Sequence, residues 1–411
     1  MNAPVARVSL LSLHTSPLAQ PGTGDSGGMN VYVRELAAGL AHAGNECTVY
    51  VRTHRADLPA RVEVEPGVTV AHVPAGPPEL AKEDLPAVVD EWVDGVGAAI
   101  AADGGTDVLH SNYWLSGMAG HRLKHELDRP LVSTFHTLAR VKSAAGDPEP
   151  EARAEAEAAV MACSDAVLAS CPAEAHQLVE LYGVPRRRIS LVAPGVEGAL
   201  FSPGPRGAAR EAVADLDLGA RPMLLLVGRI QRLKGVDVAV RALSAMRDRD
   251  ATLVVCGGPS GPDGEACLDE VAGLVAEHGL AGRVRIVPPR PHHELSSLYR
   301  AADVVVVPSR SESFGLVALE AAACGRPVVA SAVGGLSSLV DHRRTGLLLP
   351  GRDPERWATA LDGLLASPLR RERMGRAAAA AALRYRWSRA ADDLAAVYAE
   401  VTGRPPLDCA A

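Results

Sequence analysis

The sequence predicts an α/β protein made of two doubly wound domains, and three observations support this prediction. Short β-branched runs alternate with longer stretches rich in Ala and Leu, a pattern typical of parallel strands separated by helices. The alternation restarts after a Pro- and Gly-rich segment, Pro194–Gly207, which we interpret as a linker. The chain has 411 residues, which suits two cores, because one domain usually holds roughly 100–200 residues.

We assign residues 1–200 to the first domain and residues 201–385 to the second. In the first domain, apolar positions three and four residues apart predict a helix over Val31–Ala43. The strands expected in this domain are Val5–Leu13, Glu46–Arg52, Val68–Val73, Asp107–His110, Leu131–Thr134 and Ala166–Ala169.

The strands expected in the second domain are continuous apolar runs, which suit strands covered on both faces. They are Met223–Val227, Thr252–Cys256, Val284–Val287, Val304–Val307 and Val328–Ala330. A terminal helix is expected over Trp387–Thr402, within a segment, residues 386–403, that we expect to pack back on the first domain. Ligands of open α/β sheets bind beyond the carboxyl ends of the strands, so we expect a site in a cleft between two facing domains.

Composition excludes several classes of protein. A net charge of −7 with 22% charged residues argues against general nucleic-acid binding. No apolar run reaches the roughly 18–20 residues of a membrane span, and the N-terminus lacks the layout of a signal peptide. The cysteines are odd in number, seven, and form no Cys-x-x-Cys pair, so we expect no disulfide framework, no structural zinc site and a reducing cytoplasmic location.

A Gly-rich segment, Pro21–Asn30, joins the first strand to the first helix. Such a turn is suited to anions, because glycines let the backbone approach and the N–H groups of the helix start face the ligand. The alternative is an ordinary flexible loop. The segment does not match G-x-G-x-x-G, and no Gly-Lys-Ser/Thr follows, so neither a nicotinamide site nor a P-loop is supported.

The second domain places two cations, Arg229 and Lys234, directly after its first strand. Arginine can bind two phosphate oxygens at once and lysine supplies a mobile charge, so together they can neutralise a departing diphosphate. The alternative is a pair of surface cations, although the dipole of a helix start disfavours cations there. Lysine is scarce, with only four in the chain, which favours a specific role for Lys234.

Two carboxylates, Glu312 and Glu320, lie eight residues apart, around a helix expected to begin near Gly315. Glu320 stands in an apolar stretch and therefore needs a polar partner. Carboxylates accept hydrogen bonds from the vicinal hydroxyls of ribose or a hexose.

The Glu312/Glu320 spacing and the Gly228-Arg229…Lys234 motif resemble retaining nucleotide-sugar glycosyltransferases of the glycosyltransferase 4 group, which have the GT-B fold. The segments His14–Val33, Asn112–Gly117 and His136–Ala139 are similar to the D-inositol 3-phosphate glycosyltransferases of mycothiol biosynthesis, and this similarity extends over nearly the whole chain.

The resemblance implies two Rossmann-like domains facing across a cleft and transfer of N-acetylglucosamine from UDP-GlcNAc to 1D-myo-inositol 3-phosphate with retention. It implies a cytoplasmic homodimer with no required cofactor, although it leaves room for Mg²⁺, and with no metal-ligating residues. The implied catalytic residues are Arg229, Lys234, Glu312 and His136. The implied donor-binding residues are Gln20, Pro21, Gly28, Arg229, Lys234, Arg290, Glu312, Phe314, Gly315 and Glu320. The implied acceptor-binding residues are His14, Asp25, Asn30, Lys82, Tyr113, Thr137 and Arg153.

Asn112 departs from the family pattern, which has a histidine at this position beside Tyr113. This departure leaves the acceptor open, and three further hypotheses remain. The chain is a related transferase that uses another sugar phosphate or an aminocyclitol in secondary metabolism, a nucleotide-sugar epimerase on the same architecture, or a non-catalytic sensor of sugar nucleotides.

Overall fold

The computed structural model describes residues 6–22, 24–261 and 263–409. Val5 of the first predicted strand and Thr23 of the Gly-rich segment lie outside the described residues. The chain folds into two units. Unit 1 comprises Met1–Ala19, Met29–Gly195 and Trp387–Ala411, and unit 2 comprises Gln20–Gly28 and Val196–Arg386.

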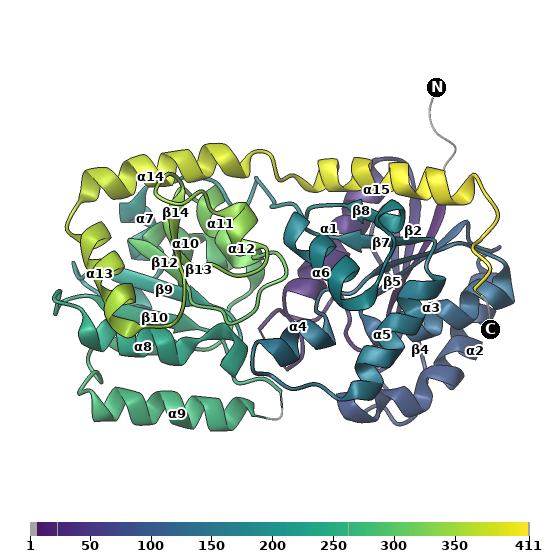
Figure 1. Cartoon of the computed structure of the whole chain (residues 1–411), viewed down its shortest axis with the longest axis horizontal. Coiled ribbons are helices and arrows are strands. Elements are labelled where there is room, and N and C mark those ends of the chain that lie inside the picture. The colour runs from purple at the N-terminus through teal and green to yellow at the C-terminus, as the bar shows by residue number, and fades with distance from the viewer. Residues whose placement is uncertain (1–5, 23, 262, 410–411) are drawn as a thin grey trace. The chain divides into compact units, whose positions relative to one another are not determined.

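Unit 1 contains an eight-stranded sheet with the order β3-β4-β2-β1-β5-β6-β7-β8 (Figure 1). All neighbouring strands pair in parallel except β3, which runs antiparallel to β4 at one edge. The strands are β1 (Arg7–Ser12), β2 (Glu46–Arg52), β3 (Arg61–Glu65), β4 (Val68–Val73), β5 (Val108–Asn112), β6 (Leu131–Thr134), β7 (Ala166–Ala169) and β8 (Ile189–Leu191).

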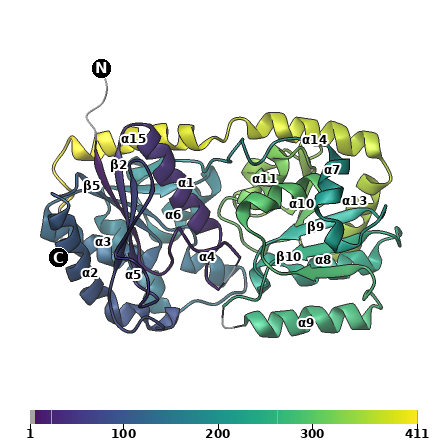
Figure 2. The same cartoon turned by 180° about the vertical axis from the view of Figure 1, so that it is seen from behind.

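Helices cover both faces of the unit 1 sheet (Figure 2). The helices of unit 1 are α1 (Gly28–His42), η1 (Lys82–Val88), α2 (Val89–Ala102), α3 (Trp114–Leu127), α4 (Ala139–Ala144), α5 (Glu151–Cys163), α6 (Pro172–Tyr182), η2 (Arg186–Arg188) and α15 (Trp387–Thr402). The short 3-10 helix η1 precedes α2, and η2 precedes β8.

Alternation along β5 shows how the two faces are built, because successive side chains point to opposite sides of a strand. Leu109 joins Trp92 of α2 and Leu123 of α3 in one apolar cluster. His110 faces the other side, where its Nδ1 lies 2.7 Å from the hydroxyl of Tyr398 on α15. Burial on both faces explains why these parallel strands are mostly apolar.

Unit 2 contains a six-stranded parallel sheet with the order β11-β10-β9-β12-β13-β14. The strands are β9 (Met223–Val227), β10 (Thr252–Cys256), β11 (Val284–Val287), β12 (Val304–Val307), β13 (Val328–Ser331) and β14 (Gly346–Leu349). The helices are α7 (Arg206–Ala212), η3 (Ala214–Leu216), η4 (Arg232–Lys234), α8 (Val236–Ala245), α9 (Gly264–Glu277), η5 (His292–Glu294), α10 (Leu295–Ala301), α11 (Leu316–Ala323), α12 (Leu336–Leu339), α13 (Pro354–Leu365) and α14 (Pro368–Ala382).

One face of the unit 2 sheet is sealed by α8, α9 and α13 around Trp357, which is fully buried in the apolar cluster. Figure 1 shows α7, α10, α11 and α14 on the other side of this sheet. The two-sided cover makes unit 2 a doubly wound domain, as the sequence predicts.

Most of the predicted strands, and the terminal helix Trp387–Thr402, agree with the structure to within one residue at each end. The helix predicted from Val31 begins earlier, at Gly28, and the strand predicted over Asp107–His110 continues to Asn112. Within the described residues, no helix is both long and apolar enough to cross a membrane.

Strands β3, β8 and β14 were not predicted from the sequence. β3 is an edge strand in which charged residues alternate with valine, and β8 has only 3 residues. Neither β3 nor β8 shows the apolar run of a central strand, so the sequence pattern did not reveal them. They are strands because they pair with β4 and β7 in the folded sheet.

Two expectations need correction, and the predicted linker can be compared with the unit boundary. Residues 20–28 belong to unit 2, although they precede most of the first helix of unit 1. The predicted linker does contain a boundary between the two units, between Gly195 and Val196, and Arg300 donates hydrogen bonds to the backbone oxygens of Leu200 and Ser202 within it. Cys163 and Cys409, which lie 246 residues apart in the sequence, form a disulfide, although the odd number of cysteines led us to expect no disulfide framework.

Candidate functional site

The carboxyl ends of adjacent parallel strands bring three predicted acceptor residues together in unit 1. His14 follows β1, Tyr113 directly follows β5, and Thr137 lies three residues after β6. β1 pairs with β5 and β5 with β6, so the loops after these strands emerge side by side at one edge of the sheet.

Tyr113 is the centre of this group. Its ring centroid lies 4.3 Å from that of His14, 5.3 Å from Nζ of Lys82 and 5.0 Å from Cζ of Arg153. Cations at such distances are attracted to the face of an aromatic ring. The structure therefore brings His14, Lys82, Tyr113 and Arg153 together, although they lie far apart in the sequence.

Arg153 is held firmly on α5, with 4% of the residue exposed. Its Nη2 donates to Oγ1 of Thr137 at 3.0 Å, and its Nε donates to Oε1 of the buried Glu157 at 2.9 Å. Its Nη1 lies 2.9 Å from a carboxylate oxygen of Glu149. These bonds fix the guanidinium direction beside Thr137.

Asn30 on α1 supports the loop after β1. Its side-chain nitrogen donates to Oγ1 of Thr15 and to the backbone oxygen of Ser16, both at 2.6 Å. Asp25, predicted beside Asn30 in the acceptor set, instead belongs to unit 2. The structure thus assigns these two predicted acceptor residues to different units.

His136 lies after β6 and contacts Asn112, the residue that departs from the family pattern. Nε2 of His136 donates to Oδ1 of Asn112 at 2.9 Å, because an amide oxygen only accepts. Burial lowers the pKa of His136 to about 3, so the imidazole is neutral near pH 7. His136 therefore contributes a neutral hydrogen-bonding ring to this edge rather than a cation.

The backbone at this edge is strained in two places. Tyr113 and His136 both have positive φ, 78° and 61°, a conformation that costs energy for residues with a Cβ. Each follows a strand directly or within two residues. Strain of this kind gathers at ligand sites, where the surrounding fold holds a side chain in one orientation.

In unit 2, the loop after β9 carries Arg229. The loops after β9 and β10 pass close to each other at Gly228 and Gly257. A Cβ on Gly257 would lie 1.9 Å from the backbone oxygen of Gly228, so position 257 requires glycine. Nη1 of Arg229 donates to Oγ of Ser260 at 3.2 Å and to the backbone oxygen of Asp25 at 3.4 Å. The Gly-rich segment and the predicted diphosphate-binding arginine are therefore in contact within one unit.

Lys234 ends η4 and forms an ion pair with Glu312, with Nζ 2.8 Å from Oε2. The backbone oxygen of Glu312 accepts from the backbone N–H of Gly335 at 3.0 Å. Gly334 has φ of 43°, and a Cβ there would lie 2.0 Å from the backbone oxygen of Glu312. The paired glycines thus allow the close approach that positions Glu312.

Glu320 is buried on α11, as its apolar sequence context predicts, and the structure defines its partners. Oε2 accepts from the hydroxyl of Tyr299 at 2.7 Å, and Oε1 lies 2.7 Å from Nε2 of His292. Burial and the charge of Glu320 raise the pKa of Tyr299 well above its usual value, so the tyrosine remains a hydrogen-bond donor. A carboxylate has about four acceptor positions, so Glu320 keeps capacity for sugar hydroxyls.

The remaining predicted donor residues also lie in unit 2. Gln20 donates to the backbone oxygen of Pro289 at 3.1 Å, and Arg290 forms an ion pair with Asp215. Phe314 is buried and its ring packs against Tyr385 with centroids 5.7 Å apart, so its backbone is better suited to a ligand than its ring. Pro21, Gly28 and Gly315 lie in the same unit.

Two sequence families match the chain. The family described as Glycosyl transferase 4-like domain matches residues 27–195, and Glycosyl transferases group 1 matches residues 210–381. Among solved structures, sucrose-phosphate synthase from Thermosynechococcus elongatus is 32% identical, with a TM-score of 0.90, covering 97% of this chain and 99% of that one. HepE from Anabaena, solved with UDP and glucose, is 17% identical with a TM-score of 0.78, covering 96% and 100%.

The relatives with curated names decide the family. The D-inositol 3-phosphate glycosyltransferase of Xylanimonas cellulosilytica is 47% identical, covering 97% of this chain and 98% of the relative. That of Thermobispora bispora is also 47% identical, covering 97% and 96%. The chain belongs to the D-inositol 3-phosphate glycosyltransferase family.

Family membership confirms that the chain is an enzyme that transfers a sugar from a nucleotide sugar, and that its fold class is GT-B, with two Rossmann-like domains. Four residues of this glycosyltransferase that hold others in place were not predicted from the sequence, namely Glu149, Glu157, Tyr299 and His292. Glu149 and Glu157 could have been found from their spacing, because each lies four residues from Arg153, the separation at which side chains on a helix form ion pairs. His292 and Tyr299 gave no signal, because only the fold brings them to Glu320.

Proposed function

We propose that this glycosyltransferase transfers N-acetylglucosamine from UDP-GlcNAc to 1D-myo-inositol 3-phosphate with retention of the α-configuration. The observation that carries the proposal is the group around Tyr113 in unit 1. Two cations, a phenol and a hydroxyl gather there in a member of a family whose curated relatives are named for inositol 3-phosphate.

Lys82, Arg153, Tyr113 and Thr137 form a chemically sensible set for one phosphate. Charge-assisted hydrogen bonds to a phosphate oxygen are shorter and roughly twice as strong as neutral ones. Arg153 is already oriented by Glu157 and Thr137, so little side-chain entropy is lost when it binds a ligand. The acceptor would bind through its phosphate and present a ring hydroxyl for glycosylation.

On the donor side, Arg229 and Lys234 are proposed to bind the diphosphate and to neutralise the charge that grows on it as the glycosidic bond breaks. Lys234 would exchange part of its ion pair with Glu312 for a phosphate oxygen, and Glu312 would then accept hydrogen bonds from the transferred sugar. Glu320 would hold the ribose hydroxyls, and Arg290 with Gln20 would lie near the base.

Retention is proposed to occur by front-face attack, in which the departing diphosphate helps remove the proton of the acceptor hydroxyl. A double displacement through a carboxylate is the other route to retention. His136, neutral because of burial, would orient a substrate hydroxyl as a hydrogen-bond partner. The protein then acts by orientation and charge stabilisation.

No metal or cofactor is required in this proposal, because two cations are assigned to the diphosphate. Mg²⁺ bound to the donor would be accessory. The expected result is that a chelator leaves most of the turnover intact. The dimeric state and the cytoplasmic location expected from the resemblance belong to the same proposal, and light scattering tests the dimer.

The test is an assay of the full chain with UDP-GlcNAc against 1D-myo-inositol 3-phosphate and free myo-inositol. The phosphorylated acceptor should be used on the order of a thousandfold better, since losing two charge-assisted bonds of about 1.5–3 kcal/mol each has that effect. Nuclear magnetic resonance of the product should show an α-linkage. Efficient glycosylation of free inositol would contradict the proposal.

A second acceptor class is favoured by one observation. Asn112 contacts His136 beside Tyr113, and its side-chain nitrogen is buried without a hydrogen-bond partner in the described part of the chain. A donor in this position suits an acceptor with a different hydroxyl arrangement. A panel of hexose phosphates and aminocyclitol phosphates in the same assay distinguishes this acceptor class from inositol phosphate. If only a member of the panel is glycosylated, the phosphate-binding role of the group around Tyr113 stands and only the identity of the acceptor changes.

The epimerase and sensor hypotheses have simple tests. A nucleotide-sugar epimerase would convert UDP-GlcNAc incubated alone, and a sensor would bind it without turnover. The glycosyltransferase relatives favour neither.

A further inference from the structure

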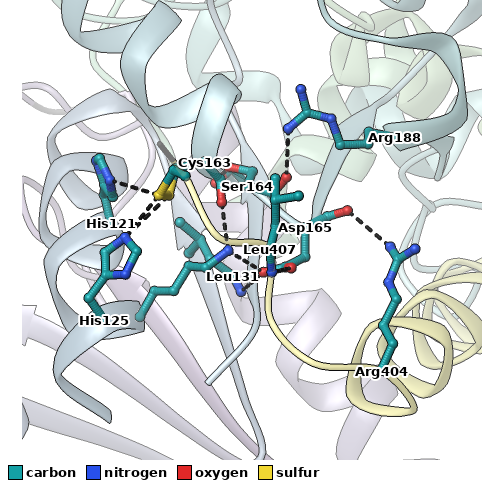
Figure 3. A network of polar contacts seen from close by, with 12 residues as sticks. His121, His125, Leu131, Cys163, Ser164, Asp165, Arg188, Arg404 and Leu407 are labelled. Atoms are coloured by element: carbon teal, nitrogen blue, oxygen red, sulfur yellow. Dashed lines mark hydrogen bonds and ion pairs between the residues drawn. A yellow bond between two sulfur atoms is a disulfide. The ribbon is translucent and has the colours of Figure 1, made fainter. Parts of the chain in front are cut away.

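Four side chains of unit 1 gather at a place outside the group around Tyr113. His121 and His125 lie on α3, Cys163 ends α5, and Cys409 lies in the tail after α15. Their ligand atoms, two imidazole nitrogens and two sulfurs, all lie within 4.8 Å of one another. We call these four residues the His–Cys cluster (Figure 3).

The nitrogen-to-sulfur distances within the cluster are near those between the ligand atoms of a tetrahedral metal site. Nε2 of His125 lies 2.9 Å from Sγ of Cys409 and 3.3 Å from Sγ of Cys163, and Nε2 of His121 lies 3.5 Å from Sγ of Cys409. With Zn–N of about 2.0–2.1 Å and Zn–S of about 2.3 Å, tetrahedral ligand atoms are about 3.3–3.8 Å apart.

The residue types select the metal. Two thiolates and two imidazoles are the ligand set of structural zinc sites, and tetrahedral S₂N₂ geometry favours zinc over the other common divalent cations. His121 and His125 are four residues apart on one helix, so both rings project from one face of α3.

A network of hydrogen bonds between segments far apart in the sequence holds the cluster in place. Lys124 Nζ donates to the backbone oxygen of Cys163 and to Asp165 Oδ2, both at 2.8 Å. The other oxygen of Asp165 accepts from the backbone N–H of Leu407 at 2.5 Å, and Arg404 donates to the backbone oxygen of Asp165 at 3.3 Å. Figure 3 shows these bonds linking the tail to the end of α5, so Cys409 reaches the cluster on a tethered segment.

We propose that, when Cys163 and Cys409 are reduced, the His–Cys cluster binds one Zn²⁺ that fastens the C-terminal tail to α3 and α5. The structure records the two sulfurs as a disulfide, and a disulfide has no thiolate to offer, so disulfide and zinc are alternative states of the same four residues. Zinc binding to the dithiol displaces two protons, one from each sulfur.

The test uses the full chain without a polyhistidine tag, reduced by a phosphine under anaerobic conditions. The phosphine takes the oxygen of a water molecule, and the two hydrogens of that water go to the two sulfurs. Co²⁺ alone is then titrated as a spectroscopic probe of the site. The expected result is about one Co²⁺ per chain, with a thiolate-to-metal charge-transfer band and the strong visible bands of tetrahedral coordination, displaced by Zn²⁺.

Cys409→Ser and His125→Ala are the test variants, because Cys409 lies in the tail and His125 is exposed, so neither change disrupts a core. Both should lose the charge-transfer band or weaken Zn²⁺ binding at least about tenfold. The exposed His176→Ala is the matched control outside the cluster and should bind like wild type.

Reduced wild type that takes up no Co²⁺, or binds it without the thiolate band, would show that the cluster is a disulfide only. Wild-type binding by Cys409→Ser would also overturn the proposal. Untreated oxidised chain should bind no metal at this site, and stoichiometric binding in that state would contradict the alternation between disulfide and zinc. All readouts are metal binding, so they are independent of the glycosyltransferase proposal.

Discussion

Arg153 in unit 1 and Arg229 in unit 2 are both assigned to phosphate groups, but the two units hold them differently. Arg153 is 4% exposed and bonded to the buried carboxylate of Glu157. The side chain of Arg229 is 26% exposed, and it donates to the hydroxyl of Ser260 and to the backbone oxygen of Asp25. The first arginine is therefore part of the folded core as well as of a site, whereas the second is attached mainly to loops.

Substitutions in the two units should therefore fail in different ways. Removing a cation that compensates a buried carboxylate destabilises the fold. Removing a partly exposed cation leaves the fold intact and removes only the charge that stabilises a leaving group.

The largest expected effect is the loss of turnover when a cation of unit 2 is removed. Arg229→Ala and Lys234→Ala should each lower kcat at least about a hundredfold, because each neutralises leaving-group charge that grows in the transition state. The urea midpoint of unfolding should stay near that of wild type. Steady-state kinetics with UDP-GlcNAc measures kcat, and fluorescence during urea unfolding measures the midpoint. Arg376→Ala, an exposed arginine on α14, is the matched control, and rates within threefold of wild type for either test variant would contradict the assignment.

Arg153→Ala should combine both kinds of damage. It leaves Glu157, which is fully buried, without its arginine, and breaking a buried pair costs roughly 3–5 kcal/mol of unfolding free energy. It should also raise the acceptor KM far more than the donor KM, as urea unfolding and steady-state kinetics would show.

The double variant Arg153→Ala/Glu157→Gln separates the two effects. It removes the unpaired charge and should recover most of the stability while the acceptor KM stays high. If the KM recovered together with the stability, Arg153 would be a structural residue only.

Lys82→Ala should give a smaller and purely functional effect. Lys82 is partly exposed at the start of η1 and lies over the ring of Tyr113. Its loss should raise the acceptor KM about ten- to a hundredfold, because this is the change in affinity expected when one charge-assisted hydrogen bond to the acceptor is lost. The donor KM and the unfolding midpoint should not change. Arg122→Ala, an exposed cation on α3, is the control.

A separate expected effect is the pH dependence of the stability of unit 1. Burial lowers the pKa values of His110 and His136 to about 3, below the unfolded value of about 6.5. The unfolded chain therefore binds more protons on acidification. Stability is fully present above about pH 6.5 and decreases toward about pH 3, by up to about 1.4 kcal/mol per pH unit for each histidine.

Urea unfolding at several pH values measures this slope, and tryptophan fluorescence is suited to it because Trp92, Trp114 and Trp387 belong to unit 1. His110→Gln should flatten the slope, since it removes one titrating group. The exposed His176→Ala should leave it unchanged, and an equal slope in His110→Gln and wild type would contradict the prediction.

The central strands and the nucleotide-sugar motifs were accessible from sequence because their signals are local. Thr252–Cys256 and Val304–Val307 are largely apolar runs, which suit a core covered on both sides. Lys234 and Glu312 are recognisable by motif, but their ion pair at 2.8 Å depends on the meeting of two loops 78 residues apart in the chain.

Local sequence patterns were enough for the doubly wound fold class, the family and the residue types of both sites, because apolar periodicity and motif spacing are properties of short segments. The folded structure was needed to show that residues 20–28 join unit 2, that Tyr299 and His292 hold Glu320, and that Cys163 meets Cys409 beside two histidines. These contacts join segments up to 288 residues apart. Their formation depends on burial and on hydrogen bonds such as that from Leu407 to Asp165, which no local pattern encodes.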